Sequence, residues 1–283
     1  MAKILDDIIN GNLKKEKAKI GVGLAKKDDE IIKSLNKAKK YADIVIVGPK
    51  ELGKVKGFEC VLVENPEEKL AEMLYQEEVD GIVRGTIDDF KTLEAYQKLI
   101  GEEKAKEMKE LSMLEDAYGR QFFISEASNP GGWTKEEKIQ NIEGIIKFMK
   151  KLGMKPKIGT IAGTRHDTYK RRKAIREGVI GILNKTYEEA EEVAEYFRKK
   201  GYEAKNYAIE LNGAVEDGCN VLVPQNGMVG NQWFRALCLI GGGKILIASR
   251  SNLPHVYEDN SRNEKDFEYH VKWAVAWANS RKK

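Results

Sequence analysis

The sequence is poor in residues that bind metals or form disulfides. Its 283 residues include only three cysteines and three histidines. The cysteines Cys60, Cys219 and Cys238 form no CxxC pair, and an odd, widely spaced set does not make a disulfide framework. The histidines lack the spacing of zinc ligands. We therefore expect no structural zinc and no metal at the functional site.

Long apolar segments are also absent. No stretch approaches the roughly 20 apolar residues that a membrane-spanning helix needs. The charged residues Lys3, Asp6 and Asp7 interrupt the first apolar residues, which argues against a signal peptide. These absences predict a cytoplasmic protein without a membrane partner.

The chain has little excess of either charge. It contains 49 Lys and Arg residues against 45 Asp and Glu residues, a formal net charge of +4. Basic runs such as Lys33–Lys40 fall on expected helices opposite acidic residues, and no aromatic residues interleave with them. We therefore expect no nucleic-acid partner. The abundance of Lys, Glu and Ile in a folded, soluble composition is typical of proteins from hyperthermophiles.

Short apolar runs rich in β-branched residues alternate with amphipathic stretches rich in Lys and Glu. Runs of this length suit buried parallel strands covered on both faces. The clearest helix is expected from Thr186, which forms a capping box with Glu189, to Lys200, where Gly201 ends it. The alternation predicts a doubly wound α/β architecture. The expected strands are Ile20–Leu24, Ile44–Val47, Val61–Val63, Gly81–Val83, Phe122–Ser125, Ile158–Ile161, Val179–Leu183, Asn220–Pro224 and Ile245–Ser249.

The length exceeds the usual size of one hydrophobic core, so we expect two domains. One boundary is expected at Lys151–Pro156, which follows a helical stretch and precedes a new strand. A second is expected near Ser249–Pro254, where the last strand ends and the chain turns polar. The prediction is a first α/β domain of residues 1–150 plus 251–283 and a second of residues 151–250.

Ligands of open α/β sheets gather at the carboxyl ends of the strands, so the residues there are candidate ligands. Arg84, Gly85 and Thr86 follow one expected strand and precede a helix that opens at Asp88. A guanidinium beside a helix N-terminus suits an anion. The alternative is a tight turn that leaves Arg84 in solvent.

Two further strand ends carry polar loops. Thr164 and Arg165 precede the neighbours His166 and Asp167, for which helix capping is a better interpretation than a catalytic dyad. The loop 224–231, PQNGMVGN, has glycines and carboxamides that suit a phosphate, although it lacks the Walker A pattern.

A third polar segment, Asp259–Arg262, joins an acid, a hydroxyl and a guanidinium. These groups suit the binding and orientation of an oxyanion. Capping of the final helix by Ser261 or Asp259 is the structural alternative.

The order of these motifs resembles the phosphotransacetylase and phosphobutyryltransferase superfamily over most of the chain. The resemblance implies two domains with an interdomain cleft, as in isocitrate and isopropylmalate dehydrogenases. It also implies a homodimer joined through the second domain. The fragments that carry it are Asp80–Thr86, Ser125–Pro130 (SEASNP), Pro156–Ile158 with Gly163-Thr164, Asn220–Val223 with Gly230-Asn231, and Asp259–Arg262.

The chain departs from the acyltransferase pattern at several positions. Arg84 stands where the family has a small Ser, Ala95 falls where it has an Arg that binds acyl phosphate, and Asn263 replaces a Gly. With these traits the chain is similar to the MtxX-type proteins, a methanogenesis-marker group of methanogenic archaea named as methyltransferase subunits. That similarity implies a transferase with a role in methyl transfer or in the chemistry of methanogenic coenzymes, and methyltransferase subunits as partners.

The resemblance predicts one site in the interdomain cleft for a small anionic substrate, either phosphorylated or a thiol coenzyme such as coenzyme A or a methanogenic coenzyme. We expect Arg84, Asn231 and Arg262 to bind the anion and Asp259 or Glu268 to act as base. The other expected site residues are Gly85, Thr86, Ser125, Thr164, Arg165, Asn226, Gly230 and Ser261.

Two other functions stay open. They are a non-catalytic ligand-binding or accessory protein of methanogenesis, which the loss of Arg at Ala95 favours, and a phosphate acyltransferase. A metal-dependent dehydrogenase of the isopropylmalate type is disfavoured. Its only candidate metal ligands, Asp259, Glu264 and Asp266, lie on one local segment.

Overall fold

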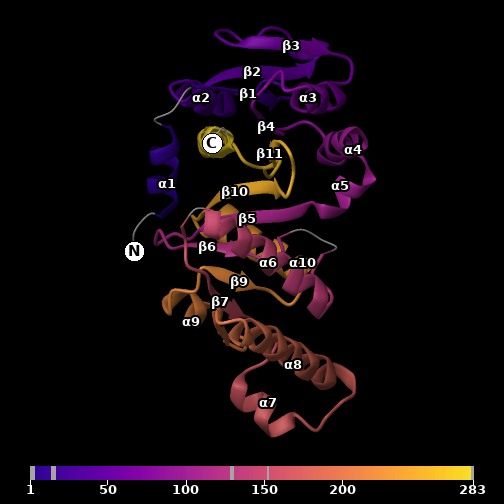
Figure 1. Cartoon of the computed structure of the whole chain (residues 1–283), viewed down its shortest axis with the longest axis vertical. Helices are drawn as coiled ribbons and strands as arrows, with labels where there is room; N and C mark the ends of the chain where they lie inside the picture. Colours follow the sequence, from indigo (N-terminus) through magenta and orange to yellow (C-terminus); the bar gives the residue numbers. More distant parts are fainter. Residues whose placement is uncertain (1–3, 14–16, 128–130, 152, 282–283) are drawn as a thin grey trace. The chain divides into compact units, whose positions relative to one another are not determined.

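The computed structural model describes residues 4–13, 17–127, 131–151 and 153–281. The chain divides into two compact units (Figure 1). The terminal unit consists of Ala2–Lys109 and Leu246–Lys283, and the central unit is Glu110–Ile245. The boundary expected at Lys151–Pro156, of which Leu152 lies outside the described residues, falls inside the central unit. The physical reason is strand pairing. Phe123 and Ile124, which precede this segment, pair with Val221 and Leu222, which lie far beyond it.

The terminal unit contains a sheet in the order β3-β2-β1-β4-β11-β10. All neighbours are parallel except β10 and β11. Its strands are β1 (Ala18–Gly23), β2 (Ala42–Pro49), β3 (Glu59–Val63), β4 (Gly81–Val83), β10 (Lys244–Ser251) and β11 (Val256–Glu258). Its helices are α1 (Ile4–Leu13), α2 (Asp29–Ala38), the short 3₁₀ helix η1 (Lys50–Leu52), α3 (Pro66–Tyr75), α4 (Asp89–Ile100), α5 (Glu102–Glu107) and α11 (Glu268–Arg281).

Alternating side chains of the terminal sheet build two apolar layers. Ile44 and Ile46 of β2 belong to a core with α2 and α11, whereas Val45 and Val47 pack with α3 and α4. This alternation is the two-residue period of a strand covered on both faces. In Figure 1, α11 lies near α2, and α3 lies near α4.

The central unit contains a sheet in the order β5-β6-β9-β7-β8, in which only β5 and β6 are antiparallel. The predicted α/β class with mainly parallel strands is therefore confirmed. The strands are β5 (Lys109–Glu115), β6 (Gln121–Ile124), β7 (Lys157–Thr160), β8 (Glu203–Asn206) and β9 (Val221–Val223). The helices are α6 (Lys135–Lys151), α7 (His166–Arg172), α8 (Gly178–Lys199), α9 (Leu211–Glu216), α10 (Gly227–Phe234) and the π-helix η2 (Arg235–Ile240).

The strand expected at Val179–Leu183 is wrong, because these residues form the first turns of α8. Thr186 is consequently not a cap. Its hydroxyl lies within the helix, where it donates to the Leu183 carbonyl at 2.7 Å and accepts from the Gly163 N–H at 2.9 Å. The predicted end of the helix is confirmed, since Gly201 follows it with φ of 83°.

Within the described part of the chain, no helix is long and apolar enough to cross a membrane. The three cysteines are free thiols, of which Cys219 is buried and the other two are half-buried.

Candidate functional site

Arg84 follows β4 and is only 2% exposed. Its Nε donates to Oδ1 of Asp259 at 2.9 Å, and its Nη2 reaches the same oxygen at 2.9 Å. Its Nη1 donates to the carbonyls of Gly85 and Ile87, and its Nη2 also donates to the carbonyl of Asn260. A guanidinium has five N–H donors, and hydrogen bonds within the terminal unit engage four of them.

The two sequence interpretations of Arg84 both miss this burial. Gly85 does form a tight turn, with φ of 70° and a Cβ position 1.9 Å from the Gly23 carbonyl oxygen, but the arginine beside it is not in solvent. Arg84 is not a free anion ligand either, since an anion would have to displace Asp259 or a backbone carbonyl. Its role in anion binding stays a prediction, and that role now requires a rearrangement.

Arg250, on β10, completes a charged cluster around Asp259. Its Nη2 lies 3.2 Å from Oδ2 of Asp259, so two guanidiniums flank one carboxylate. Burial opposes ionisation of this carboxyl, but Arg84 and Arg250 outweigh burial and hold the pKa of Asp259 below its usual range. Arg250 was not among the predicted site residues, although it directly follows the expected strand Ile245–Ser249 and the strand-end rule covers that position.

Asn260 joins the loops that follow β4 and β11. Its Oδ1 accepts from the Gly85 N–H at 2.8 Å, and its Nδ2 donates to the carbonyls of Gly85 and Ser261 at 3.2 and 3.0 Å. Thr86 extends the network to the loop after β1, because its Oγ1 accepts from the Ala25 N–H at 2.9 Å. The strand-end rule thus found residues that the terminal unit does bring together.

Arg262 is the exposed arginine of this strand edge, with a side chain 52% exposed. It binds the carboxylate of Asp89 and lies 3.8 Å from that of Asp88, at the start of α4. Ser261 is held by its N–H, which donates to Glu264 at 2.8 Å. An anion at Arg262 would compete with two acidic side chains that water already reaches.

A fully buried ion pair joins Glu258, which directly precedes the segment Asp259–Arg262, to His270 of α11. His270 Nδ1 is 2.6 Å from Glu258 Oε1, and His270 Nε2 is 3.1 Å from Glu264 Oε1. Glu258 also accepts from the hydroxyl of Ser249 and from the N–H of Ala248. Burial lowers the pKa of His270, but the two carboxylates outweigh burial and raise this pKa to about 10. An imidazolium therefore ties α11 to β11 and to Glu264, which in turn holds the Ser261 backbone.

The two carboxylates expected as bases engage different cations. Glu268, at the start of α11, lies 3.5 Å from Lys40 Nζ and 3.3 Å from Lys272 Nζ. Asp259 instead binds the two arginines described above. The structure therefore gives the two candidates separate electrostatic environments.

In the central unit, both asparagines of the loop 224–231 make internal contacts. Asn226 caps α10, since its Oδ1 accepts from the Val229 N–H at 3.0 Å. Asn231 Nδ2 donates to the Ala127 carbonyl at 2.9 Å, and its Oδ1 accepts from Arg235 Nε at 2.9 Å. Asn231 lies in the central unit and the arginines in the terminal unit, so their convergence stays a prediction.

Two buried polar atoms at neighbouring strand ends have no hydrogen-bond partner among the residues that the structure covers. They are Oγ of Ser125, directly after β6, and Oε1 of Gln225, two residues after β9. Buried polar atoms are rarely left unpaired, so this edge suits a bound polar group. Thr164, also expected there, is buried as well. The rest of the expected motif, Ser128–Pro130, lies outside the described residues.

The loop after β7 does not contain a catalytic dyad. His166 Nδ1 is 2.6 Å from the Tyr187 hydroxyl, and Asp167 binds Arg171 at 3.0 Å. Arg165, 69% exposed, precedes α7 without a capping side chain.

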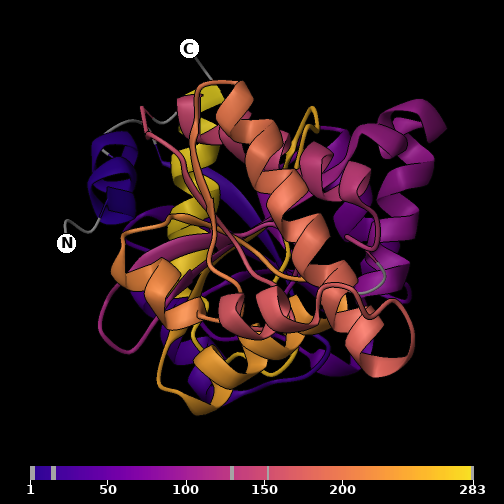
Figure 2. The ribbon, with the colours of Figure 1, turned by 90° about the horizontal axis from the view of Figure 1, so that it is seen from below.

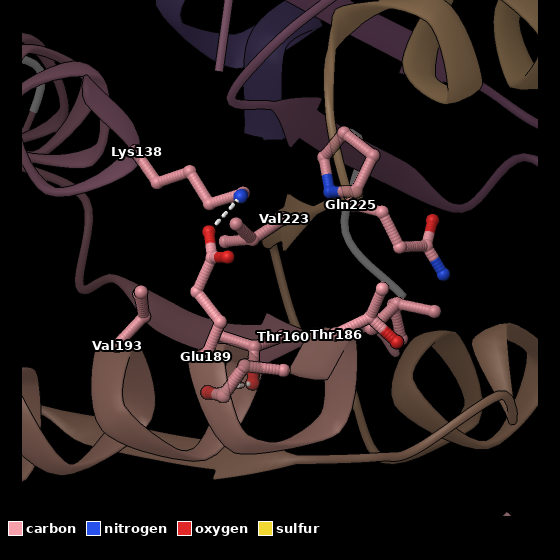
Figure 3. A pocket seen from close by; sticks show the side chains of 10 residues that line it. Lys138, Thr160, Thr186, Glu189, Val193, Val223 and Gln225 are labelled. Carbon is pink, nitrogen blue, oxygen red and sulfur yellow. Dashed lines mark hydrogen bonds and ion pairs between the residues drawn. The ribbon is translucent and has the colours of Figure 1, made fainter. Parts of the chain in front are cut away.

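A cavity beside this edge is too small for a substrate. Figure 3 shows the ion pair between Lys138 of α6 and Glu189 of α8, with Gln225, Thr160 and Thr186 also labelled along the lining. Its volume is ≈ 20 Å³, which is room for about one water molecule. The cavity therefore suits a water bound to these polar groups.

The close approach of α10 to the strand end yields a stability prediction. A Cβ on Gly230 would lie 1.7 Å from the backbone oxygen of Glu126. Gly230→Ala should therefore lower the free energy of unfolding by about 1–3 kcal/mol, because α10 or the strand must shift. Urea denaturation measures this loss. Gly11→Ala is the matched control, since no atom lies within 4 Å there, and equal effects in both variants would contradict the prediction.

No family model matches the chain. A relative from Methanosarcina mazei, named "Putative methyltransferase mtx subunit X", is 27% identical over 260 residues, 90% of this chain and 89% of the relative. A relative of the same name from Methanosarcina barkeri is 28% identical over 250 residues, 87% of this chain and 88% of the relative. The predicted resemblance to MtxX-type proteins is confirmed along most of the chain.

Solved structures of phosphotransacylases share the fold. A branched-chain phosphotransacylase from Enterococcus faecalis V583 has a TM-score of 0.64 at 15% identity, covering 92% of this chain and 99% of that chain. A phosphotransacetylase from Streptococcus pyogenes has a TM-score of 0.64 at 12% identity, covering 100% of both chains. The expected superfamily fold is confirmed, and at these identities the likeness extends to the fold alone.

Proposed function

We propose that this chain is an MtxX-like transferase of methanogenic archaea that acts on a small anionic substrate, phosphorylated or a thiol coenzyme. The names of the relatives support the methyl-transfer context, and the shared fold supports an anionic substrate. The single observation that carries the proposal is the cluster of Arg84, Asp259 and Arg250 at the strand edge that also bears Arg262. Its two guanidiniums exceed its one carboxylate, so the cluster has an excess positive charge.

Within this proposal the charged residues take different roles. Arg262, exposed and held by acidic side chains, binds the substrate anion by exchanging those carboxylates for it. Asp259 holds Arg84 and Arg250 in place. Its lowered pKa makes it a weak proton acceptor, so it is not the base. Proton removal from a thiol would fall to another carboxylate, for which Glu268 remains the candidate. Asn231 and Ser125, both in the central unit, stay predicted site residues.

The proposal includes partners. The relatives are named as a subunit of a methyltransferase, so we propose that this chain assembles with methyltransferase subunits. We also propose a homodimer, which the resemblance to the phosphotransacetylase superfamily supports.

Removing Arg262 tests the site. We expect Arg262→Ala to lower kcat/KM by about 10- to 100-fold for the anionic substrate, since one charge-assisted contact is lost. The assays are coenzyme A-dependent acyl-phosphate formation and methyl transfer to methanogenic thiols. Arg171→Ala is the matched control, because Arg171 is also exposed and paired with an aspartate, but on α7. Equal rates for wild type and Arg262→Ala would remove this arginine from the mechanism.

A non-catalytic ligand-binding or accessory role is the second candidate. The four internal hydrogen bonds of the buried Arg84 favour it, because they leave this arginine little capacity to bind a reacting group. Thermal shifts with phosphate, acyl phosphates, coenzyme A and coenzyme M separate the two functions. A ligand that raises the melting temperature without turnover supports the binding role.

A further inference from the structure

The hairpin of α7 and α8 concentrates positive charge in a chain that is otherwise nearly balanced. Between Lys170 and Lys185 the sequence has six basic residues and one acidic residue, whereas the whole chain has an excess of only four basic residues. The ten residues from Lys170 to Val179 are all exposed. Figure 2 views the ribbon from below and shows this hairpin in the central unit.

Apolar side chains of the same hairpin are also exposed. Ile175 is 42% exposed, Val179 is 73% exposed and Ile182 is 66% exposed. Val179, Ile182 and Lys185 are spaced by three residues, so they follow one face of α8. We call the surface formed by Ile175, Val179, Ile182 and the cations Lys170, Arg172, Lys173 and Lys185 the hairpin patch. These four cations form no ion pair with any residue that the structure describes.

Contacts between α7, α8 and the turn that joins them hold the hairpin patch in a fixed conformation. Asn184 is 2% exposed, and its Nδ2 donates to the carbonyls of Arg172 and Ile175 at 2.8 and 2.9 Å. Tyr169 of α7 stacks on Tyr187 of α8, with ring centroids 4.0 Å apart. The turn that presents Ile175 is therefore anchored to α8, and its exposed apolar side chains are not a consequence of a loose loop.

We propose that the hairpin patch binds the surface of an anionic lipid membrane. Four to eight Lys and Arg residues on an amphipathic helix are typical of contact with anionic headgroups, and aliphatic side chains can enter the headgroup boundary. Such peripheral contact needs no spanning helix. The expectation of no membrane partner rested only on the lack of a spanning helix and of a signal peptide in the sequence. The proposal concerns a different surface from the reaction site and does not depend on the reaction.

Other occupants fit the hairpin patch less well. A symmetric contact with a second copy would place like charges against one another. A nucleic acid would use the cations but not the aliphatic side chains, and Tyr169 already stacks on Tyr187. A protein interface is usually depleted of Lys, which supplies three of the four unpaired cations here.

Vesicle co-sedimentation of the full chain tests the proposal. The probes are vesicles of phosphatidylcholine alone and of phosphatidylcholine mixed with phosphatidylglycerol. We expect sedimentation only with the mixed vesicles, weakened by sodium chloride. The variant Lys170→Glu/Arg172→Glu/Lys173→Glu should lower the partition coefficient by on the order of a hundredfold or more. Val179→Ser/Ile182→Ser should lower it by about tenfold.

Matched controls keep the test specific. Leu239→Ser/Ile240→Ser removes exposed aliphatic side chains elsewhere in the central unit and should leave partitioning unchanged. Circular dichroism melting should show that all variants keep the fold, since every substituted side chain is exposed. Absence of sedimentation with anionic vesicles overturns the proposal. A dimer that dissociates in Val179→Ser/Ile182→Ser also overturns it. So does binding to polyuridylate that is as strong as binding to the anionic vesicles and is unchanged by the aliphatic substitutions.

Discussion

Replacing Arg84 with methionine is expected to lower the free energy of unfolding by about 3–5 kcal/mol. The variant leaves the largely buried Asp259 with one cation instead of two. It also removes the donors for three backbone carbonyls, those of Gly85, Ile87 and Asn260. Each buried acceptor left without a donor adds about 1–3 kcal/mol of desolvation, which relaxation of the loops partly relieves.

Urea denaturation followed by circular dichroism measures this loss. Arg165→Met is the matched control, because Arg165 is 69% exposed and its stability effect should stay within about 0.5 kcal/mol. Arg84→Lys should remain clearly destabilised, since an ammonium cannot reach acceptors placed for a planar fork. If Arg84→Met keeps wild-type stability but loses ligand affinity, Arg84 is an anion ligand and its internal contacts are incidental.

The pairing of Arg84 with Asp259 shows where prediction from sequence stops. The strand-end rule selected Arg84, which directly follows β4, whereas Asp259 was selected only as part of the polar segment that follows the expected strand Ile245–Ser249. Their contact, however, joins positions 175 residues apart. Nothing in the sequence near Arg84 indicates that its guanidinium would form an ion pair with the carboxylate of Asp259. Burial of a charge depends on tertiary packing, which the pattern of residue types does not encode.

The helix–strand error at Val179–Leu183 has a different cause. The run VIGIL is β-branched and apolar, and a run of five residues fits a buried strand and a helical turn equally well. The structure decides for the helix because the chain continues helically to Lys199, with Asn184 tying the first turns to the preceding loop. Val179 and Ile182 of this run are exposed on the surface of α8 and do not lie in a sheet.

The strands β5, β8 and β11 were not predicted. In β5 and β8 the reason is that polar and charged residues interrupt the apolar pattern. β8, Glu203–Asn206, alternates exposed and buried residues at the edge of its sheet and has no apolar run. β5 carries charged residues at both ends. The central unit begins at Glu110, ahead of the expected boundary at Lys151–Pro156, because its first two strands are β5 and β6, which pair with each other. The parallel core strands could be predicted because buried parallel strands leave near-continuous apolar runs.

The second large effect is expected at the buried ion pair of His270. At neutral pH, His270→Gln should lower the free energy of unfolding by about 3–5 kcal/mol, because Glu258, 0% exposed, loses its cation. The sign of the pH dependence follows from the raised pKa of His270. Folding stabilises the imidazolium, so the contribution is complete below the unfolded pKa of 6.5 and is lost as pH rises through about 10. The gap in stability between wild type and variant should therefore narrow in strongly alkaline solution.

Two measurements check this pair independently. Melting temperatures of wild type and His270→Gln across pH give the difference in stability between the two proteins. Titration of the surface lysines affects both proteins equally and cancels in this difference. Proton NMR of the imidazole rings gives the pKa directly, and a chain with three histidines is simple to assign. Glu264→Gln removes the outer carboxylate and should lower the pKa of His270 while the contact with Glu258 remains. A His270 that titrates near 6.5 would show that the pair is neutral, and that Ser261 and Arg262 are positioned without help from an imidazolium.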